Sequence, residues 1–208
     1  MYVFSRSTIA ALGKQLEAVP AALTIAEKVS EISGAELNVF SARFGAPLGT
    51  IMWSRRVDSM VELQEMSDKV LADPDYLAMV GGMSGLFMTP PEDTIGRVLS
   101  APLEGEPTRF WGITRAAMTA GRYAEAVEFG VEIADYMGSA LGAQTVFLKA
   151  NYGGFADVTW LVGMNSMDEV DKFDDWQLSD AGYQSRVEKA AGLFVENSGQ
   201  QSLIEKLN

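Results

Sequence analysis

Six polar or aromatic side chains are the candidates for binding or catalysis in this sequence. They are Arg6, Asn38, Trp53, Arg115, Tyr152 and Trp160. The amide of Asn38, the indole of Trp53 and the guanidinium group of Arg6 could together hold an aromatic enol and a carbonyl oxygen through hydrogen bonds and stacking. Arg6 and Arg115 could each present a guanidinium group to a carboxylate or an enolate.

The same side chains also have a structural interpretation. Trp53 and Trp160 could be core anchors that fill a sheet–helix interface, and the two arginines could form ion pairs with some of the 28 acidic residues. Tyr152 follows Lys149 near a glycine turn, and a lysine acts as a base only when it is strongly desolvated. The residue types alone leave both interpretations open.

The composition excludes several kinds of chemistry. The 208 residues include no cysteine and no histidine. This excludes disulfides, thiolate nucleophiles, zinc–thiolate sites, Ser-His-Asp triads and histidine ligands to haem or iron. Catalysis would depend on carboxylates, Lys, Tyr, Arg, Ser or Trp, and we expect neither a metal site nor a cofactor.

Charge and hydropathy limit the partners. The net charge of −12 is spread over both halves and there is no basic stripe, so nucleic acids and anionic membranes are poor candidate partners. No stretch approaches the roughly 18 uncharged apolar residues of a transmembrane helix. The first residues lack the basic and apolar regions of a signal peptide. We therefore expect a cytoplasmic protein.

The elements that position these residues occur twice. Residues 53–87 align without gaps onto residues 160–194 with 12 identities in 35 positions, including Trp53/Trp160, and the similarity extends outward with shifts of one residue. This outer alignment pairs Arg6 with Arg115, Asn38 with Val146, and Leu99 with Leu207. A feature found in one copy only, such as Asn38, reflects either function or drift.

Each copy has the residue patterns of a strand, a helix, a hairpin, a second helix and a last strand. In the first copy the strands are expected at Tyr2–Ser7, Leu37–Phe44, Thr50–Arg56 and Ile95–Leu99. The first helix is expected at about 13–32 and ends at Gly34, and the second runs from about 60 to Leu71, with a turn near Asp73-Pro74 and further helix through Met83. Ser59 and Glu62 form a capping box at the second helix. The order β-α-β-β-α-β predicts an α+β fold of two ferredoxin-like modules, residues 1–100 and 109–208, joined by a linker at 101–108. One such sheet has helices on only one face, so we expect the two sheets to pack together as an intrachain α/β barrel.

The chain resembles the dimeric α/β-barrel superfamily in its tandem form, and its NIPSNAP-like branch in particular. The resemblance rests on element order, module length and the segments Trp-x5-Ser-Met-x-Glu and Asp-x2-Tyr, found at residues 53–62 and 73–76 and again at 160–169 and 180–183. It implies a site, where one exists, between the sheet and the two helices of one module. The superfamily includes cofactor-independent and haem-degrading monooxygenases, haem peroxidases, isomerases and ligand sensors, so the resemblance does not assign one activity.

Two functions remain. The first is a non-catalytic barrel that binds a small hydrophobic molecule or a protein partner, or that assembles into homo-oligomers of such barrels. The second is a cofactor-independent, monooxygenase-like or isomerase-like enzyme acting on a small hydrophobic substrate. A cavity of about 300 Å³ or more between sheet and helices, lined by Trp53 or Trp160 with a buried arginine, would favour the enzyme.

Overall fold

A computed structural model describes residues 1–100, 105 and 107–208 of the chain. Within these residues the protein has six helices and eight strands. They form two compact units, residues 1–95 with 205–208, and residues 96–204. The expected linker at 101–108 lies largely outside the described residues, since 101–104 and 106 are not among them.

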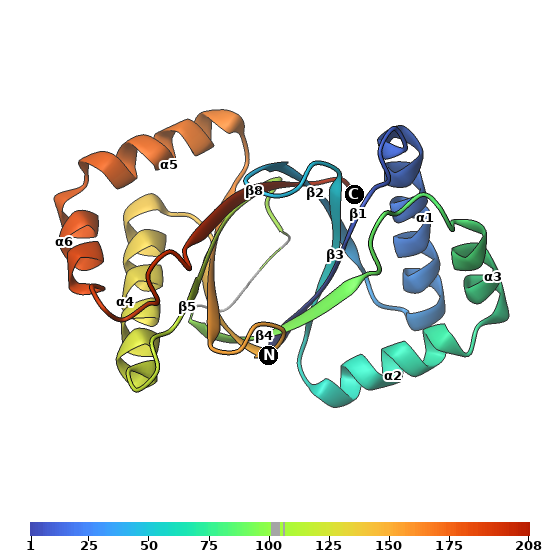
Figure 1. The fold of residues 1–208 in the computed structure, drawn as a ribbon, viewed down its shortest axis with the longest axis horizontal. Helices are drawn as coiled ribbons and strands as arrows, with labels where there is room; N and C mark the ends of the chain where they lie inside the picture. The colour runs from blue at the N-terminus through green and yellow to red at the C-terminus, as the bar shows by residue number, and fades with distance from the viewer. Residues whose placement is uncertain (101–104, 106) are drawn as a thin grey trace. The chain divides into compact units, whose positions relative to one another are not determined.

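The first unit carries three helices on one face of its strands (Figure 1). Its elements, in chain order, are β1 (Tyr2–Ile9), α1 (Gln15–Ser33), β2 (Asn38–Phe44), β3 (Thr50–Val57), α2 (Met60–Leu71), α3 (Pro74–Gly82) and the first part of β4 (Glu92–Ser100). The predicted turn near Asp73-Pro74 separates α2 from α3.

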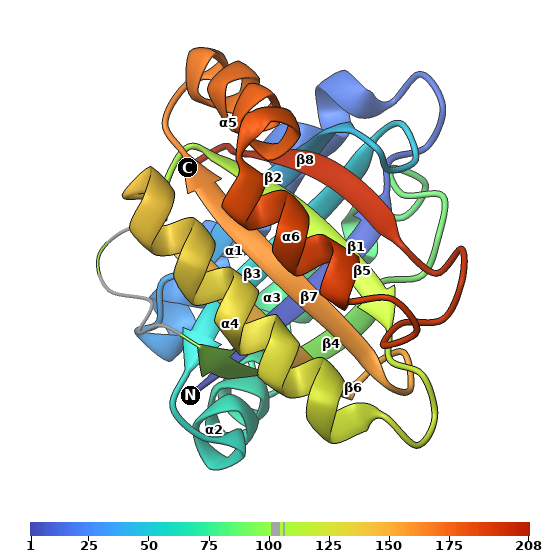
Figure 2. The same ribbon diagram turned by 90° about the vertical axis from the view of Figure 1, so that its left-hand side faces the viewer.

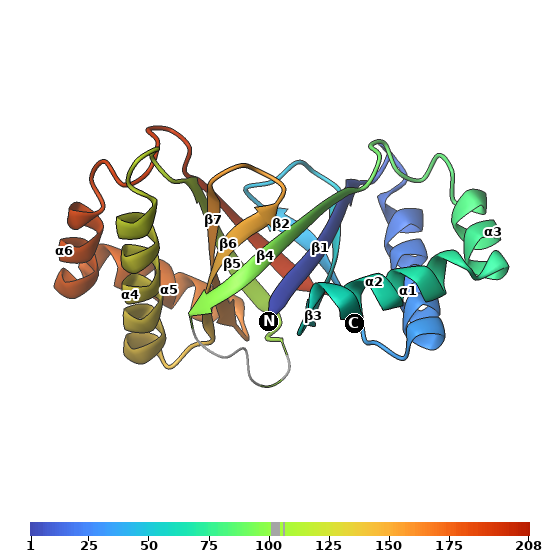
Figure 3. The same ribbon diagram turned by 90° about the horizontal axis from the view of Figure 1, so that it is seen from below.

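The second unit repeats this order and again has its helices on one face (Figure 2). Its elements are β5 (Phe110–Ala117), α4 (Tyr123–Leu141), β6 (Thr145–Tyr152), β7 (Asp157–Met164), α5 (Met167–Ser179), α6 (Ala181–Lys189) and β8 (Gln200–Lys206). Strands β4 and β8 each contribute residues to both units. Seen from below, α4, α5 and α6 stay on the same side of β5 and β7 (Figure 3).

The strands follow the order β1-β3-β2-β8-β5-β7-β6-β4 and close as a barrel. Neighbouring strands β1 and β3, β2 and β3, β5 and β7, and β6 and β7 pair antiparallel. The predicted fold class, α+β with an intrachain α/β barrel, is confirmed. A common origin of the two units by duplication stays a prediction.

Side-chain caps fix where the helices begin. Ser59 accepts a hydrogen bond from the backbone N–H of Glu62, and the Glu62 carboxylate accepts one from the N–H of Asp58. This is the predicted capping box, and it satisfies N–H groups that have no partner inside the helix. Ser166 and Glu169 cap α5 in the same way. Gly34 ends α1 with a positive φ of 71°, as the C-cap pattern predicted.

Alternation along the strands decides which side chains meet the helices. Ile51 and Trp53 of β3 point toward α1 and join the first core cluster, whereas the intervening Met52 and Ser54 point to the opposite face. In the second unit Val158, Trp160 and Val162 have the same orientation toward α4. Each unit therefore buries one face of its strands beneath its own helices.

The last residues of the chain belong to the first unit. Leu207 donates a backbone hydrogen bond to the carbonyl of Val39 at 2.8 Å. The Asn208 side chain accepts from the N–H of Val39 at 2.8 Å and donates to the carbonyl of Leu37 at 2.9 Å. The backbone at the start of β2 is thus satisfied by residues about 170 positions later in the sequence.

In the part of the chain that the structure describes, no helix is both long and apolar enough to cross a membrane.

Candidate ligand-binding cavity

A cavity of about 310 Å³ lies between the strands and the helices of the first unit. Its walls come from β1, β4, α1, α2, α3 and the residue before β2. Most of the lining is apolar: Phe4, Ile25, Val29, Leu37, Met60, Leu63, Met66, Val70, Leu71 and Ile95. The volume lies at the lower end of the range for small-molecule sites, which are usually apolar with a few polar groups.

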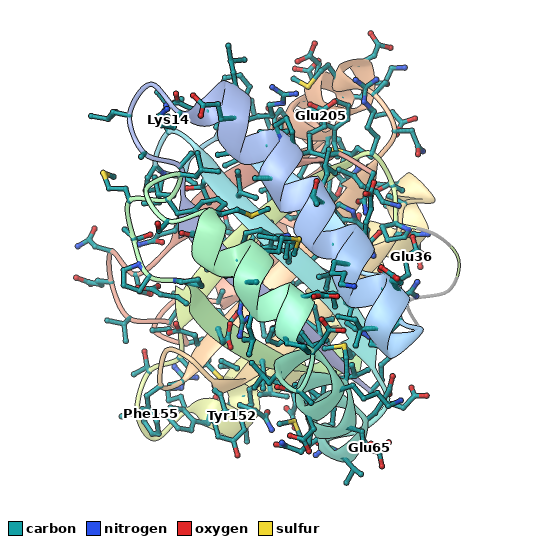
Figure 4. All side chains as sticks on the ribbon, turned by 90° about the vertical axis from the view of Figure 1, so that its right-hand side faces the viewer. Lys14, Glu36, Glu65, Tyr152, Phe155 and Glu205 are labelled. Atoms are coloured by element: carbon teal, nitrogen blue, oxygen red, sulfur yellow. The ribbon has the colours of Figure 1, made fainter. Side chains whose placement is uncertain are left out.

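Helix α2 forms one wall of the cavity because its apolar residues recur at helical spacing. Leu63, Met66 and Val70 lie three and four residues apart and therefore share one face. Glu65 lies on the exposed side of α2 (Figure 4). The Ser59 cap fixes the start of this helix, and so it also fixes the position of these side chains along the strands.

An ion pair supplies the charged groups of the cavity. Arg6 of β1 donates from Nε to Oδ1 of Asp93 at 2.7 Å and from Nη2 to Oδ2 at 2.8 Å, which is a two-pronged contact between planar groups. The side chains of Arg6 and Asp93 are 43% and 45% exposed. The hydrogen bond to Asp93 raises the pKa of the Arg6 guanidinium above its ordinary value, with burial acting in the opposite direction.

Three other polar residues line the cavity. Tyr76 at the start of α3 is buried, and it lies close enough to Arg6 to interact electrostatically. Gln64 and Ser67 contribute an amide and a hydroxyl group from α2. The cavity therefore combines a large apolar wall with a small number of hydrogen-bonding groups.

A second arginine contacts α2 but is not among the residues that line the cavity. Arg55 of β3 donates from Nη2 to the Glu62 carboxylate at 2.8 Å, and its Nη1 lies 3.8 Å from the sulfur of Met66. Its side chain is 15% exposed. Like Arg6, this guanidinium group has a carboxylate as its direct partner.

Two of the candidate residues, Arg6 and Trp53, lie directly opposite each other on β1 and β3 and on the same face. Only Arg6 lines the cavity. The Trp53 indole donates from Nε1 to the carbonyl of Ala22 at 2.9 Å and packs edge-on against Phe87. These contacts are those of a core anchor between the strands and α1.

Asn38 lies on the other face of the same strands. Its register partner is Ser54, which pairs in turn with Ser5 of β1, and this row alternates with the Arg6–Trp53 row. The structure therefore does not bring Asn38 together with Trp53 and Arg6. The Oδ1 atom of Asn38 is buried and has no hydrogen-bond partner among the residues that the structure describes.

The alignment of Arg115 with Arg6 is wrong by one residue. Arg6 pairs with Trp53, but the residue that pairs with Trp160 is Thr114, while Arg115 pairs with Thr159. Because side chains alternate along a strand, the shift places Arg115 on the face away from the helices, where it is exposed. Thr114 is the positional counterpart of Arg6.

The remaining two candidates also lie apart from the cavity. Trp160 donates from Nε1 to the carbonyl of Gly130 at 3.0 Å, as Trp53 does to Ala22, and it packs against Phe147 in the second core. Tyr152 is 63% exposed and lies with Phe155 at the turn between β6 and β7 (Figure 4).

Asp93 is the functional candidate that the sequence pattern missed. The last strand of the first unit was expected to begin at Ile95, but β4 begins at Glu92, so Asp93 lies on the strand beside Arg6. Its acidic and proline-rich surroundings, Pro90-Pro91-Glu92, resemble a loop. A signal was present in the alternation of Asp93 with Ile95, which places both on one face.

The second unit has different side chains at two of the positions that line the cavity of the first unit. Phe173 corresponds to Met66. Gly112 pairs with Val162 as Phe4 pairs with Arg55, so Gly112 corresponds to Phe4. A Cβ atom on Gly112 would lie 3.9 Å from Cε1 of the Phe173 ring. Phe173 in turn stacks on Trp176.

The charged pair also differs between the units. Thr114 stands in place of Arg6, and Gln201 stands in place of Asp93 in the alignment that pairs Leu99 with Leu207. The Arg6–Asp93 pair is therefore specific to the first unit.

Comparison with known proteins supports the fold and not an activity. No family model matches the sequence, and no curated protein matches it significantly. Among solved structures, a candidate monooxygenase from Fusobacterium nucleatum matches with a TM-score of 0.74 and 9% identity, over 100% of this chain and 92% of that one. An anthrone oxidase-like protein matches with a TM-score of 0.69 and 14% identity, over 100% of this chain and 91% of that one.

A NIPSNAP family protein of unknown function from Agrobacterium tumefaciens also aligns, with a TM-score of 0.37 and 21% identity over 46% of this chain and 85% of that one. A match with so low a TM-score carries no argument, and placement in the NIPSNAP-like branch stays a prediction.

Proposed function

We propose that this protein binds a small, largely apolar molecule in the cavity of the first unit. The observation that carries the proposal is the 310 Å³ space beneath α2, with its apolar walls and the Arg6–Asp93 pair. Close packing normally leaves few voids larger than a water molecule, so a cavity of this size favours a ligand site. At the position of Met66 the second unit carries Phe173.

Binding without catalysis is the function that the cavity groups support best. Both oxygens of Asp93 accept hydrogen bonds from Arg6, and Trp53 and Trp160 use their indole N–H groups within the core. The polar residues of the cavity are suited to orient a ligand.

The test is a comparison of ligand binding between the wild-type protein and a variant with a smaller cavity. In V29M/M66F, two lining residues become the residues at the matching positions of the second unit, Met137 and Phe173. Native mass spectrometry, and thermal shift with a panel of small apolar compounds, are expected to show a bound molecule in the wild type and at least about tenfold weaker binding in V29M/M66F.

The matched control makes the opposite exchange, M137V/F173M, in the second unit. It is expected to bind as the wild type does, because it leaves the cavity unchanged. Equal binding by V29M/M66F and the wild type would place the ligand elsewhere and reject the proposal.

The alternative is a cofactor-independent, monooxygenase-like or isomerase-like enzyme. It is favoured by the similarity of the whole chain to structures described as a candidate monooxygenase and as anthrone oxidase-like. Incubation of the bound compound with the protein in air, followed by mass analysis and chromatography, tests it. Addition of one oxygen atom, or conversion to an isomer, that is lost in V29M/M66F would establish catalysis.

A further inference from the structure

The charges around the cavity restrict the ligand that it can accept. One guanidinium group, that of Arg6, lines the cavity, and a second, that of Arg55, contacts α2. Each contacts a carboxylate, Arg6 with Asp93 and Arg55 with Glu62. A positive charge that already has a carboxylate partner offers little additional attraction to an anion. The protein as a whole carries a net charge of −12, which further disfavours a negatively charged ligand.

The N-terminus of α2 does not supply an anion site either. Met60 lines the cavity at the first turn of this helix, where free N–H groups would favour a negative group. The Ser59 hydroxyl and the Glu62 carboxylate already accept hydrogen bonds from N–H groups at this end. Glu62 also places its own negative charge there.

Both members of the Arg6–Asp93 pair can nevertheless form further hydrogen bonds. Asp93 uses two of the five N–H groups of the Arg6 guanidinium, and each carboxylate oxygen can accept more than one hydrogen bond. The pair therefore presents donors and acceptors side by side with no net charge. Both side chains are a little under half exposed, so a ligand can reach them from the cavity.

We infer that the cavity selects an uncharged, largely apolar molecule that carries a hydrogen-bond acceptor beside a donor at one end, such as a primary carboxamide, and discriminates against the corresponding carboxylate. The acceptor of the ligand contacts the Arg6 guanidinium, the donor contacts the Asp93 carboxylate, and the apolar part lies along Leu63, Met66 and Val70. This inference rests on the proposed function and adds the chemical class of its ligand.

The test uses two probes of nearly the same shape, 2-naphthamide and 2-naphthoate, measured by isothermal titration calorimetry at pH 7. The wild type is expected to bind 2-naphthamide at least about tenfold more tightly. In D93N the Arg6 charge loses its partner, and the preference is expected to reverse in favour of 2-naphthoate. The pair is nearly half exposed, and ion pairs of this kind contribute little to stability, so D93N should fold.

Each result is informative. Equal affinities, tighter binding of 2-naphthoate to the wild type, or an unchanged preference in D93N would overturn the inference while leaving a binding cavity in place. Binding of neither probe, or binding that persists unchanged in V29M/M66F, would reject the proposed function as well. If D93N does not fold, R6Q takes its place and is expected to weaken 2-naphthamide binding by about tenfold.

Discussion

Gly130 and Phe147 fit together in the second core because the glycine leaves room for the ring. A Cβ atom on Gly130 would lie 2.5 Å from Cε1 of Phe147, which is closer than atoms approach in folded proteins. In the first unit the matching positions hold Ala22 and Val39, both fully buried. The space between the helix and the strand is thus filled by a glycine and a phenylalanine in the second unit, and by an alanine and a valine in the first.

This complementarity predicts that Gly130→Ala destabilises the protein. Alanine favours a helix over glycine by about 1 kcal/mol, but a clash with a packed ring costs about 1–3 kcal/mol. We expect a net loss of about 1–2 kcal/mol in urea unfolding. In G130A/F147V, which copies Ala22 and Val39, the loss should be smaller than the sum of the two single losses.

Gly138, in the same helix, is the control. A Cβ atom there would lie 3.7 Å from its nearest neighbours, so Gly138→Ala is expected to stabilise the protein by up to about 1 kcal/mol. If G130A and G138A shifted the unfolding midpoint in the same direction, the explanation based on the Phe147 ring would be wrong.

Trp53→Phe and Trp160→Phe should have similar effects. Each substitution removes a buried hydrogen bond to a carbonyl of the long helix and leaves unfilled volume. We expect a loss of about 2–3 kcal/mol in each variant from chemical denaturation. Tyr152→Phe, at an exposed site, is the control and should change stability by less than about 0.5 kcal/mol. A loss no larger than this in both tryptophan variants would contradict their role as core anchors.

The hydrogen bond from Tyr136 to Asp180 predicts a pH effect. It is the main cause that lowers the pKa of Asp180, and the backbone N–H of Tyr183 acts in the same direction. Because the pKa in the folded state lies below that in the unfolded state, Asp180 stabilises the fold above about pH 4. This contribution is lost as the pH falls through the folded-state pKa.

Tyr136→Phe should therefore reduce the loss of stability on acidification. The thermal midpoint, measured from about pH 4 downward, is expected to fall less steeply in Y136F than in the wild type. Tyr183→Phe is the control, because it keeps the Tyr136 hydroxyl and the Tyr183 backbone N–H that contact Asp180. Parallel curves for Y136F and the wild type would show that this hydrogen bond does not shift the titration.

The Ser59 cap links the stability of α2 to the cavity. Ser59→Ala removes a hydrogen bond to the N–H of Glu62 and is expected to cost about 1 kcal/mol. Since α2 forms one wall of the cavity, the substitution should also weaken 2-naphthamide binding. Ser166→Ala removes the matching cap of α5 at a similar cost and should leave binding unchanged. Equal affinity of S59A and S166A for 2-naphthamide would show that the Ser59 cap does not affect ligand binding.

Local patterns predicted the elements because each depends on a few neighbouring residues. Ser59 with Glu62, Gly34 after α1, and Asp73-Pro74 between α2 and α3 all mark boundaries that the structure confirms. The alignment of β5 was one residue out of register because it matched the identical residues Arg6 and Arg115 and did not follow the alternation of side chains along the strand. Thr114 is the true counterpart and offers no sequence identity to guide the alignment.

The cavity could not be predicted from the sequence because it depends on unoccupied volume. Met66 and Phe173 are both apolar and belong to the same pattern, and only the three-dimensional packing shows that unoccupied space lies beside Met66. The partnership of Arg6 with Asp93 joins residues 87 positions apart, and periodicity carries no information over such a separation.

The contacts of Leu207 and Asn208 with the start of β2 determine when the first unit can be completed. A nascent chain synthesised from its N-terminus presents residues 37–39 long before their partners exist. The backbone groups at this edge must wait for residues 207 and 208, and closing so long a loop is intrinsically slow. Translation could therefore expose an unpaired strand edge until these residues have been made, and this is where premature association would begin.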